Sequence, residues 1–414
     1  MSQRNCLLRE LQVLDLANEK ASFCSKLLAD FGAEVIKIER SGGDASRWIG
    51  PFQENKAHPE KSLSFWYNNT NKLGITLNLG VREGQEIFRQ LASKVDVIIE
   101  TFPPGYLERF ELAYESLSKT NPRLILASVS GFGQDGPYQQ YKSCDIVASA
   151  MGGQMYVCGA SDTPPLKPYG EQSYYLASLF AAIGVLLALR ERNHSGKGQH
   201  IDISLQEAVA ATLERVLVRY FYDGVVSQRR GKEQTLPLLL PCRDGYIVLT
   251  MDREWDILVS LLDNESMAGD LKEERWQEEE YRRQHLSHIT DTLSQWTMRH
   301  TRSELFELGQ LMRFPWAPVN SLEEMVNSPQ LLARNFFVPV EHPELASHFP
   351  YPGSPYRFLA HRTRNEDFIS VSKEESRGNL KRAPLIGEHN AKVYQEKLGL
   401  SIDELAKLSA SGVI

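Results

Sequence analysis

Residues 164–184, PPLKPYGEQSYYLASLFAAIG, contain side chains that could act as nucleophiles or as acid–base groups. The segment contains Glu171, Tyr174 and Tyr175 but no aspartate. A carboxylate can serve as a nucleophile or proton acceptor, whereas a phenol with an ordinary pKa of about 10 is mostly protonated at neutral pH. If a helix has already begun at Glu171, this residue and Tyr174 share one face. Alternatively, Glu171 is only a first-turn acid favoured by the helix dipole.

Length and composition indicate a globular protein with two domains and no nucleic-acid partner. The 414 residues, 42% apolar and 24% charged, are too many for one compact core. A net charge of −7 argues against a nucleic-acid-binding surface. The five cysteines are scattered without a CxxC, which is typical of free thiols in a reducing cytoplasm and not of disulfides or a metal site. The start lacks a signal-peptide pattern, and the apolar run 176–189 is too short for a bilayer, so we expect a buried helix and no membrane partner.

The first third of the chain alternates strand and helix patterns. We expect strands at 10–17, 33–39, 95–101 and 123–133, and helices at 21–32 and 81–94. Strand–helix–strand units of this kind predict an α/β fold, with a Rossmann-like large domain built on a parallel sheet. No GxGxxG follows the first strand, which disfavours a NAD-dependent dehydrogenase.

The rest of the chain predicts a second, smaller α/β domain. We expect a helix at 171–192, a strand and one long helix within 200–221, and a strand with a turn at 240–251, followed by charged, Trp-bearing helices. The predicted division is 1–225 for the first part of the large domain, 226–325 for the small domain, and 326–414 for a C-terminal segment that returns to the large domain.

Long stretches of the chain match a known family in order and almost end to end. They include LLADFGAEVIKIER, GGDASRWIGPF, NTNKLGITLNL, VDVIIETFPPG, SVSGFGQDGPY, ALRERNHSGKGQHIDISLQEA, FPWAPVNSLEEM, SPQLLARNFF and PLIGEHNAKVYQEKLGLSIDELAKLSASGVI. On these motifs the chain resembles the class III CoA-transferase (CaiB/BaiF-type) family, which includes formyl-CoA and carnitine CoA-transferases and α-methylacyl-CoA racemase. The resemblance implies a dimer of interlocked rings, with the active site between the large domain of one chain and the small domain of its partner.

The resemblance also implies a site for coenzyme A, as part of a thioester substrate and not as a permanently bound cofactor. CoA carries phosphates, which need cations and backbone donors. The matching positions are Arg40, Lys72, Thr101, Phe102, Arg109 and Lys142. From spacing alone, Arg40 would be a strand-end arginine in a surface ion pair, and Lys72 and Lys142 could equally be solvated lysines. Thr101 replaces the asparagine that is usual in relatives.

Tyr174 stands at the position of the family's nucleophile. In the transferases an aspartate attacks the acyl-CoA thioester, forming a mixed anhydride and then an aspartyl-CoA thioester. Counting forward from Pro165 and back from Gly184 both lead to Tyr174. A tyrosine cannot form a CoA thioester because it has no carbonyl of its own. Glu171 is the nearest carboxylate that could take over.

Two further places in the sequence, one loop and one acidic residue, can be compared with the family pattern. In the loop ANEKAS (17–22), Glu19 and Lys20 fall where relatives carry small neutral residues next to the thioester, and form either a rebuilt acid–base pair or a surface ion pair. Asp145 could orient a substrate or cap the helix that follows it. It is preceded by Cys144, where the racemases have a catalytic histidine, so a racemase of that type is disfavoured. We expect His194, His200 and His389 to be structural.

Three functions remain open from the sequence. The first is CoA transfer between an acyl-CoA and a carboxylic acid, with a displaced nucleophile. The second is acyl-CoA isomerisation, proton transfer or hydrolysis on the same scaffold. The third is a non-catalytic, CoA-binding subunit that pairs with an aspartate-bearing homologue, so the expected assembly is a homodimer or a heterodimer. The sequence does not identify the acyl group or the acceptor acid.

Overall fold

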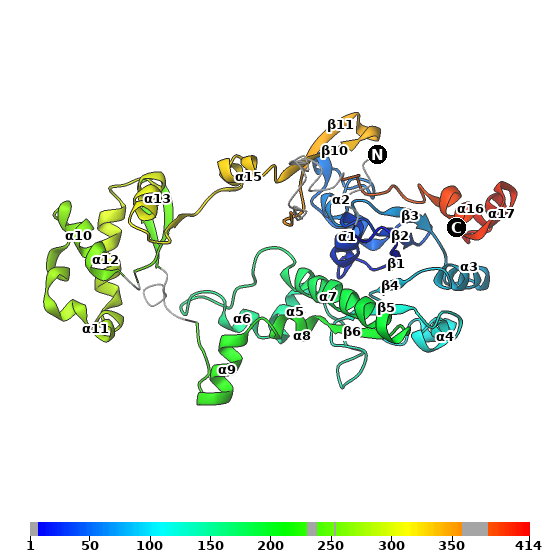
Figure 1. The fold of residues 1–414 in the computed structure, drawn as a ribbon, viewed down its shortest axis with the longest axis horizontal. Helices are drawn as coiled ribbons and strands as arrows, with labels where there is room; N and C mark the ends of the chain where they lie inside the picture. The colour runs from blue at the N-terminus through cyan, green and yellow to red at the C-terminus, as the bar shows by residue number, and fades with distance from the viewer. Residues whose placement is uncertain (1–6, 230–237, 252–253, 358–379) are drawn as a thin grey trace, which may run out of the picture. The chain divides into compact units, whose positions relative to one another are not determined.

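The computed structural model describes residues 7–229, 238–251, 254–357 and 380–414, which form two compact units (Figure 1). The first unit comprises the described residues of Met1–Met155, Lys167–Gly224 and Leu332–Ile414, and the second those of Tyr156–Leu166 and Val225–Leu331. The sequence division placed 156–166 in the large domain, and this detail was wrong. Arg229 holds the segment in the second unit, because its guanidinium donates to the carbonyls of Ala160 (3.2 Å) and Thr163 (3.3 Å).

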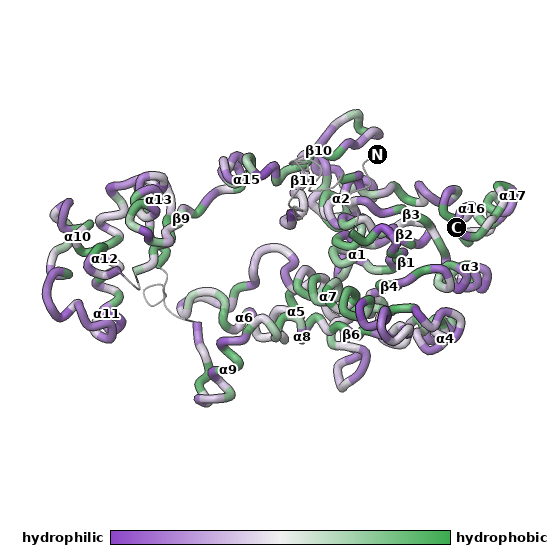
Figure 2. The backbone as a smooth tube through the Cα atoms, viewed as in Figure 1, coloured by the Kyte–Doolittle hydropathy of each residue, from purple (hydrophilic) through white to green (hydrophobic). Residues whose placement is uncertain are grey.

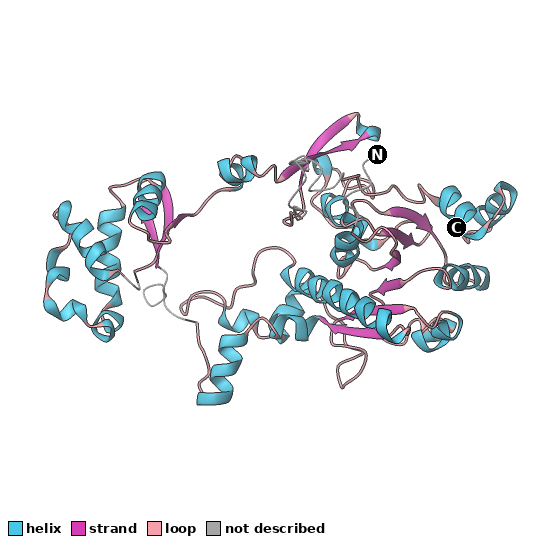
Figure 3. Cartoon of the chain, viewed as in Figure 1, coloured by secondary structure: helices cyan, strands magenta, loops and turns pink. Residues whose placement is uncertain are grey.

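The first unit is built on a six-stranded parallel sheet (Figure 3). Its strands are β1 (Gln12–Leu16), β2 (Glu34–Glu39), β3 (Leu73–Thr76), β4 (Val97–Glu100), β5 (Ile125–Ser130) and β6 (His200–Ser204), in the spatial order β3-β2-β1-β4-β5-β6. The central strands are nearly continuous runs of buried residues, as expected when helices cover both faces of a parallel sheet. The order reverses between β1 and β4, and this switch point is where open α/β sheets usually bind ligands.

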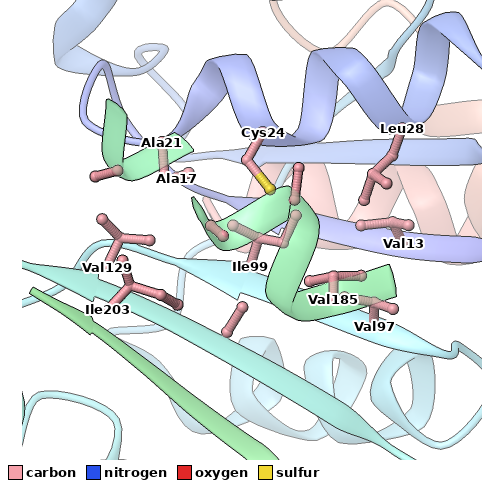
Figure 4. Packing of buried hydrophobic residues seen from close by; sticks show 14 of the residues in the cluster. Val13, Ala17, Ala21, Cys24, Leu28, Val97, Ile99, Val129, Val185 and Ile203 are labelled. Carbon is pink, nitrogen blue, oxygen red and sulfur yellow. The ribbon is translucent and has the colours of Figure 1, made fainter. Parts of the chain in front are cut away.

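Helices pack on both faces of this sheet. One face is covered by α1 (Ser22–Asp30), α5 (Asp145–Met151), α7 (Gln172–Ser195) and α8 (Leu205–Ala210). Figure 4 shows part of this core, in which Cys24 and Leu28 of α1 and Val185 of α7 pack over the strand residues Val97 and Ile99. The other face is covered by α3 (Arg82–Ala92), α4 (Tyr114–Thr120), α16 (Asn390–Leu398) and α17 (Ile402–Ala410). The C-terminal segment therefore completes the core of the first unit.

The remaining elements of the first unit are short. They are α2 (Leu63–Asn68), α6 (Gln154–Val157), α9 (Glu214–Asp223), α15 (Pro329–Ala333), and the antiparallel hairpin of β10 (Phe337–His342) and β11 (Ser347–Pro352). Helices α6 and α15 lie where the chain passes between the units. The long helix expected within 200–221 is instead divided into α8 and α9, because Leu213 leaves the helical conformation at φ −101°, ψ 36°.

The second unit has a small sheet and a tryptophan-rich core. Strands β7 (Leu238–Cys242), β8 (Gly245–Leu249) and β9 (Ala317–Pro318) form the sheet, and the strand with a turn expected at 240–251 corresponds to the hairpin of β7 and β8. Its helices are α10 (Trp255–Asn264), α11 (Glu279–Gln284), α12 (Leu286–Thr297), α13 (Arg302–Leu311) and α14 (Leu322–Val326). The side chains of Trp276, Trp296 and Trp316 are almost completely buried in this core.

Helix α7 is mostly apolar over residues 176–189 (Figure 2), but only one side of it is buried. In the part of the chain that the structure describes, it is the one helix long and apolar enough to cross a membrane. Of its most apolar stretch of 18 residues, 44% is buried within the protein. The expectation of a buried helix therefore holds for one side alone. The other side exposes Leu179, Phe180, Ile183, Leu186 and Leu187.

Candidate active site

Two loops meet at the carboxyl ends of β1 and β4, at the switch point of the sheet. The backbone N–H of Asn18 donates to Oγ1 of Thr101 (3.0 Å), and the Thr101 hydroxyl donates to Oδ1 of Asn18 (3.0 Å). Thr101 and the adjacent Phe102 are two of the residues that the sequence placed beside CoA. Their loop is therefore fixed directly to the loop that carries Glu19 and Lys20.

Tyr174 lies in the first turn of α7 and belongs to the core between this helix and the sheet. Its side chain is buried with Ala177 and Ala181 of the same helix, and the whole residue is only 6% exposed. Burial, followed by the nearby Glu19 carboxylate, raises the pKa of the phenol above its usual value, and a backbone hydrogen bond from Asp145 offsets only part of this. The neutral phenol is therefore the stable form at physiological pH, which makes Tyr174 a poor nucleophile.

Glu171 and Glu19 lie close enough to Tyr174 to influence its ionisation. Burial raises the pKa of Glu171, and repulsion from Glu19 and Asp145 adds to this effect. Burial also raises the pKa of Glu19, although attraction to Lys20 and Lys37 opposes the increase. The structure thus gathers the acidic residues predicted from the sequence into one cluster at the start of α7.

Glu171 is the N-cap residue of α7, so the helix has not begun at this position and the condition for a shared helical face is not met. Its φ of −104° and ψ of 58° are not helical, and its side chain forms no capping hydrogen bond. Its backbone carbonyl accepts the N–H groups of Tyr174 (3.1 Å) and Tyr175 (3.2 Å). The half-buried carboxylate forms no hydrogen bond or ion pair with any described residue in the structure, and remains available.

Asp145 caps α7, and the expectation that it might cap its own helix was wrong. It is the first residue of α5, but its Oδ1 accepts the backbone N–H of Ser173 (2.9 Å) in the first turn of α7. Its Oδ2 pairs with the ammonium group of Lys167 (2.5 Å). Sequence reasoning missed Lys167, because nothing in the local pattern PPLKPYG links this lysine to an acid 22 residues earlier. Asp145 and Lys167 together fix the start of α7, and they thereby fix the position of Tyr174 in its first turn.

Three of the predicted CoA-binding cations are exposed at loops of the first unit. Arg40 follows β2 and donates from Nε to the carbonyl of Gly43 (3.0 Å), Arg109 lies in the short 3₁₀ helix Glu108–Phe110, and Lys142 precedes α5. Within the described ranges, no carboxylate comes within ion-pair distance of any of the three. Their charges are therefore free to meet phosphates.

Lys72 is placed differently. Its side chain is completely buried, and its ammonium group donates to Oδ2 of Asp15 (2.9 Å), the carbonyl of Ser22 (3.0 Å) and Oδ1 of Asn69 (2.8 Å). An ammonium group has three protons, and all of them are used. The structure therefore contradicts both the phosphate-binding and the solvated-lysine interpretations of Lys72.

A cavity of about 340 Å³ lies beneath the segment that follows β4. It is lined by Glu100, Ser128 and His200, and Ser128 Oγ is 2.9 Å from Nε2 of His200. Glu100 accepts the backbone N–H of Phe102 (2.6 Å), and burial raises its pKa to about 7. The described residues contain no cluster of His, Cys, Asp and Glu able to hold a metal ion.

The fold is an open α/β sheet with a candidate site at its switch point, as in many enzymes of this class. A family model described as CoA-transferase family III matches residues 8–390, and the chain belongs to this family of transferases. It is 31% identical over 411 residues to the succinyl-CoA:(R)-benzylsuccinate CoA-transferase subunit BbsE of Thauera aromatica, covering 96% of this chain and 97% of the relative. It is 32% identical over 422 residues to succinyl-CoA–D-citramalate CoA-transferase of Chloroflexus aurantiacus, covering 98% of both.

The fold is also found in a solved structure. A CaiB/BaiF family protein from Brucella suis superposes with a TM-score of 0.80 at 29% identity, covering 95% of this chain and all of that one. The similarity extends over both units.

Proposed function

We propose that this protein transfers CoA between an acyl-CoA and a carboxylic acid, with Glu171 in place of the aspartate that Tyr174 has replaced. One observation carries the proposal: the Glu171 carboxylate has no hydrogen-bond or ion-pair partner among the described residues, and it lies beside the buried phenol at the start of α7. Arg40, Arg109 and Lys142 would hold the phosphates of CoA. The segment 17–20 would border the thioester.

The chemistry then proceeds through Glu171 in balanced steps. Its carboxylate attacks the thioester carbonyl and expels CoA as a thiolate, which leaves a mixed anhydride. The thiolate attacks the Glu171 carbonyl, releases the first acid as a carboxylate, and forms a glutamyl-CoA thioester. The acceptor carboxylate attacks this thioester and expels the thiolate, giving a second anhydride. Attack of the thiolate on the acceptor carbonyl yields the new acyl-CoA and restores Glu171.

Trapping of the intermediate tests this assignment. The purified protein is incubated with succinyl-CoA, treated with hydroxylamine or borohydride, digested, and examined by mass spectrometry. We expect modification of Glu171 in the wild-type protein and none in Glu171→Gln, while Glu191→Gln, at an exposed glutamate near the other end of α7, serves as the matched control and is still modified. Modification of Tyr174 in place of Glu171 would refute the assignment.

A second candidate is a CoA-binding subunit whose partner supplies the aspartate. Two observations favour it: α7 and α9 expose several large apolar side chains, among them Phe221 (76%) and Tyr222 (86%), and the Thauera aromatica relative is named as a subunit. We propose that a second chain, either identical or homologous, covers these surfaces in an interlocked dimer. If the protein forms no trapped intermediate alone, but an intermediate forms on an aspartate of a co-purifying homologue, this second candidate replaces the first.

A further inference from the structure

Lys72 occupies one end of a buried charge network beneath the loop that follows β1. Its partner Asp15 is the fourth residue of β1 and is also completely buried. Besides the ammonium of Lys72, the carboxylate accepts the hydroxyl of Ser25 (2.7 Å) and the backbone N–H of Ala17 (2.9 Å). Asp15 therefore joins the lysine directly to the first residue of the loop.

A second buried lysine completes the network. Lys37 lies opposite Asp15 in the register between β1 and β2, and its ammonium group donates to the carbonyl of Ala17. The backbone N–H and the carbonyl of Ala17 are thus both hydrogen-bonded to buried charged side chains of β1 and β2. At the other end of the loop, the carbonyl of Ser22 accepts a hydrogen bond from the ammonium group of Lys72.

Four residues lie between these anchor points, and Glu19 and Lys20 are the two charged ones among them. Asn18 closes the turn between them and Ala17, because its Oδ1 accepts the backbone N–H of Lys20 (3.1 Å) and its carbonyl accepts that of Ser22 (3.0 Å). The loop is therefore fixed at Ala17 and Ser22 by buried charges and at Asn18 by Thr101. Loss of the Lys72 anchor would remove the buried side-chain contact that holds Ser22, where the loop enters α1.

We propose that Lys72 is a positioning residue, which acts through Asp15 and Ser22 to fix the loop 17–22 against the thioester end of the bound acyl-CoA. This inference rests on the proposed function for the identity of the ligand and for the place of the loop beside the thioester. On this inference, Lys72 affects how the protein holds the thioester end of acyl-CoA and does not bind the phosphates of CoA.

Two ligand probes separate positioning from phosphate binding in the variant Lys72→Met. Adenosine 3′,5′-bisphosphate carries phosphates of CoA but no thioester, and succinyl-CoA carries both. We expect the affinity for the bisphosphate to stay within about 2-fold of wild type and that for succinyl-CoA to fall about 10-fold, because misplaced groups act only where they contact ligand. A merely structural role would weaken both equally, and phosphate binding would weaken the bisphosphate. Either result overturns the proposal.

Amide hydrogen exchange measures the loop itself without any ligand. In Lys72→Met we expect residues 17–22 to exchange about 10-fold faster or more, because local opening no longer breaks buried contacts. Lys26→Met is the matched control, since Lys26 is also a buried lysine, pairs with Asp30 within α1, and does not contact the loop. Unchanged exchange at 17–22 in Lys72→Met, or equal acceleration in Lys26→Met, overturns the proposal.

If Lys72→Met does not fold, the pair Asp15→Asn with Lys72→Met removes the uncompensated buried charge and is measured in the same way. Failure of the proposed function is seen separately, because wild-type protein would then bind neither probe. The exchange experiment would still report whether Lys72 holds the loop.

Discussion

Replacing Glu100 by glutamine should make the stability of the first unit much less dependent on pH. Glu100 is 4% exposed at the end of β4, and burial raises its pKa to about 7, against hydrogen bonds from Ser128 and Phe102 that favour the charged form. Because the pKa is higher in the folded state than in the unfolded chain, the folded protein binds more protons between pH 4.5 and 7. Its stability therefore falls as pH rises through this window.

The size of the effect follows from the two pKa values. The difference between about 7 and the ordinary value of 4.5 corresponds to about 3 kcal/mol, at about 1.4 kcal/mol per pH unit, and this full cost applies above pH 7. Glutamine has the same shape and still accepts the N–H of Phe102, but it is never charged. We expect Glu100→Gln to match wild type at pH 4.5 and to exceed its unfolding free energy by up to about 3 kcal/mol at pH 8.

Urea denaturation at several pH values between 4.5 and 8, followed by amide exchange in Val97–Glu100, measures the first unit alone. Glu108→Gln is the matched control, because Glu108 is an exposed glutamate beside the same cavity. If the difference in unfolding free energy between Glu100→Gln and wild type does not change with pH, the reasoning is wrong.

Three further results are expected. Lys167→Met should lower stability by about 1 kcal/mol and speed amide exchange in the first turn of α7, because Asp145 loses its cation. Tyr174→Phe should keep transferase activity within about 3-fold, whereas Glu171→Gln should lose about 10³-fold or more, which steady-state assays with succinyl-CoA would measure. Burial lowers the pKa of His342 below 6.5, so the folded state binds this proton less readily. The hairpin β10–β11 should therefore open more easily as pH falls through 6.5, and exchange rates corrected for intrinsic chemistry would show this.

The sequence predicted most elements of the first unit because their patterns are local. The apolar runs at 10–17 and 33–39 became β1 and β2, and the periodic segment 81–94 became α3. The strand β3 was not identified, because Gly74 interrupts the apolar pattern of its sequence LGIT. The spatial order of the strands was also beyond the sequence, because it depends on crossovers and not on any one segment.

The site illustrates the same difference. The family motifs identified Glu19, Asp145, Glu171 and Tyr174 as candidate site residues, and the structure places them close together. The burial of Lys72 could not be predicted, because its partner Asp15 is 57 residues away and a lysine after NTN has no local sign of an ion pair. Long-range electrostatic contacts of this kind depend on the fold as a whole.

The charge balance at the start of α7 links these observations to the proposed chemistry. Glu19 and Asp145 both repel the Glu171 carboxylate, whereas Lys167 forms its ion pair with Asp145. Attack by the Glu171 carboxylate would remove one negative charge from this cluster and pass it to the departing thiolate, so the repulsion that raises the pKa of Glu171 also favours its acylation. An aspartate at the position of Tyr174 would place a further negative charge among the same three acids, in a buried core position. On the proposed mechanism, the phenol and the glutamate are therefore complementary changes: the neutral side chain fills the former site, and the carboxylate moves to the more exposed edge of the helix.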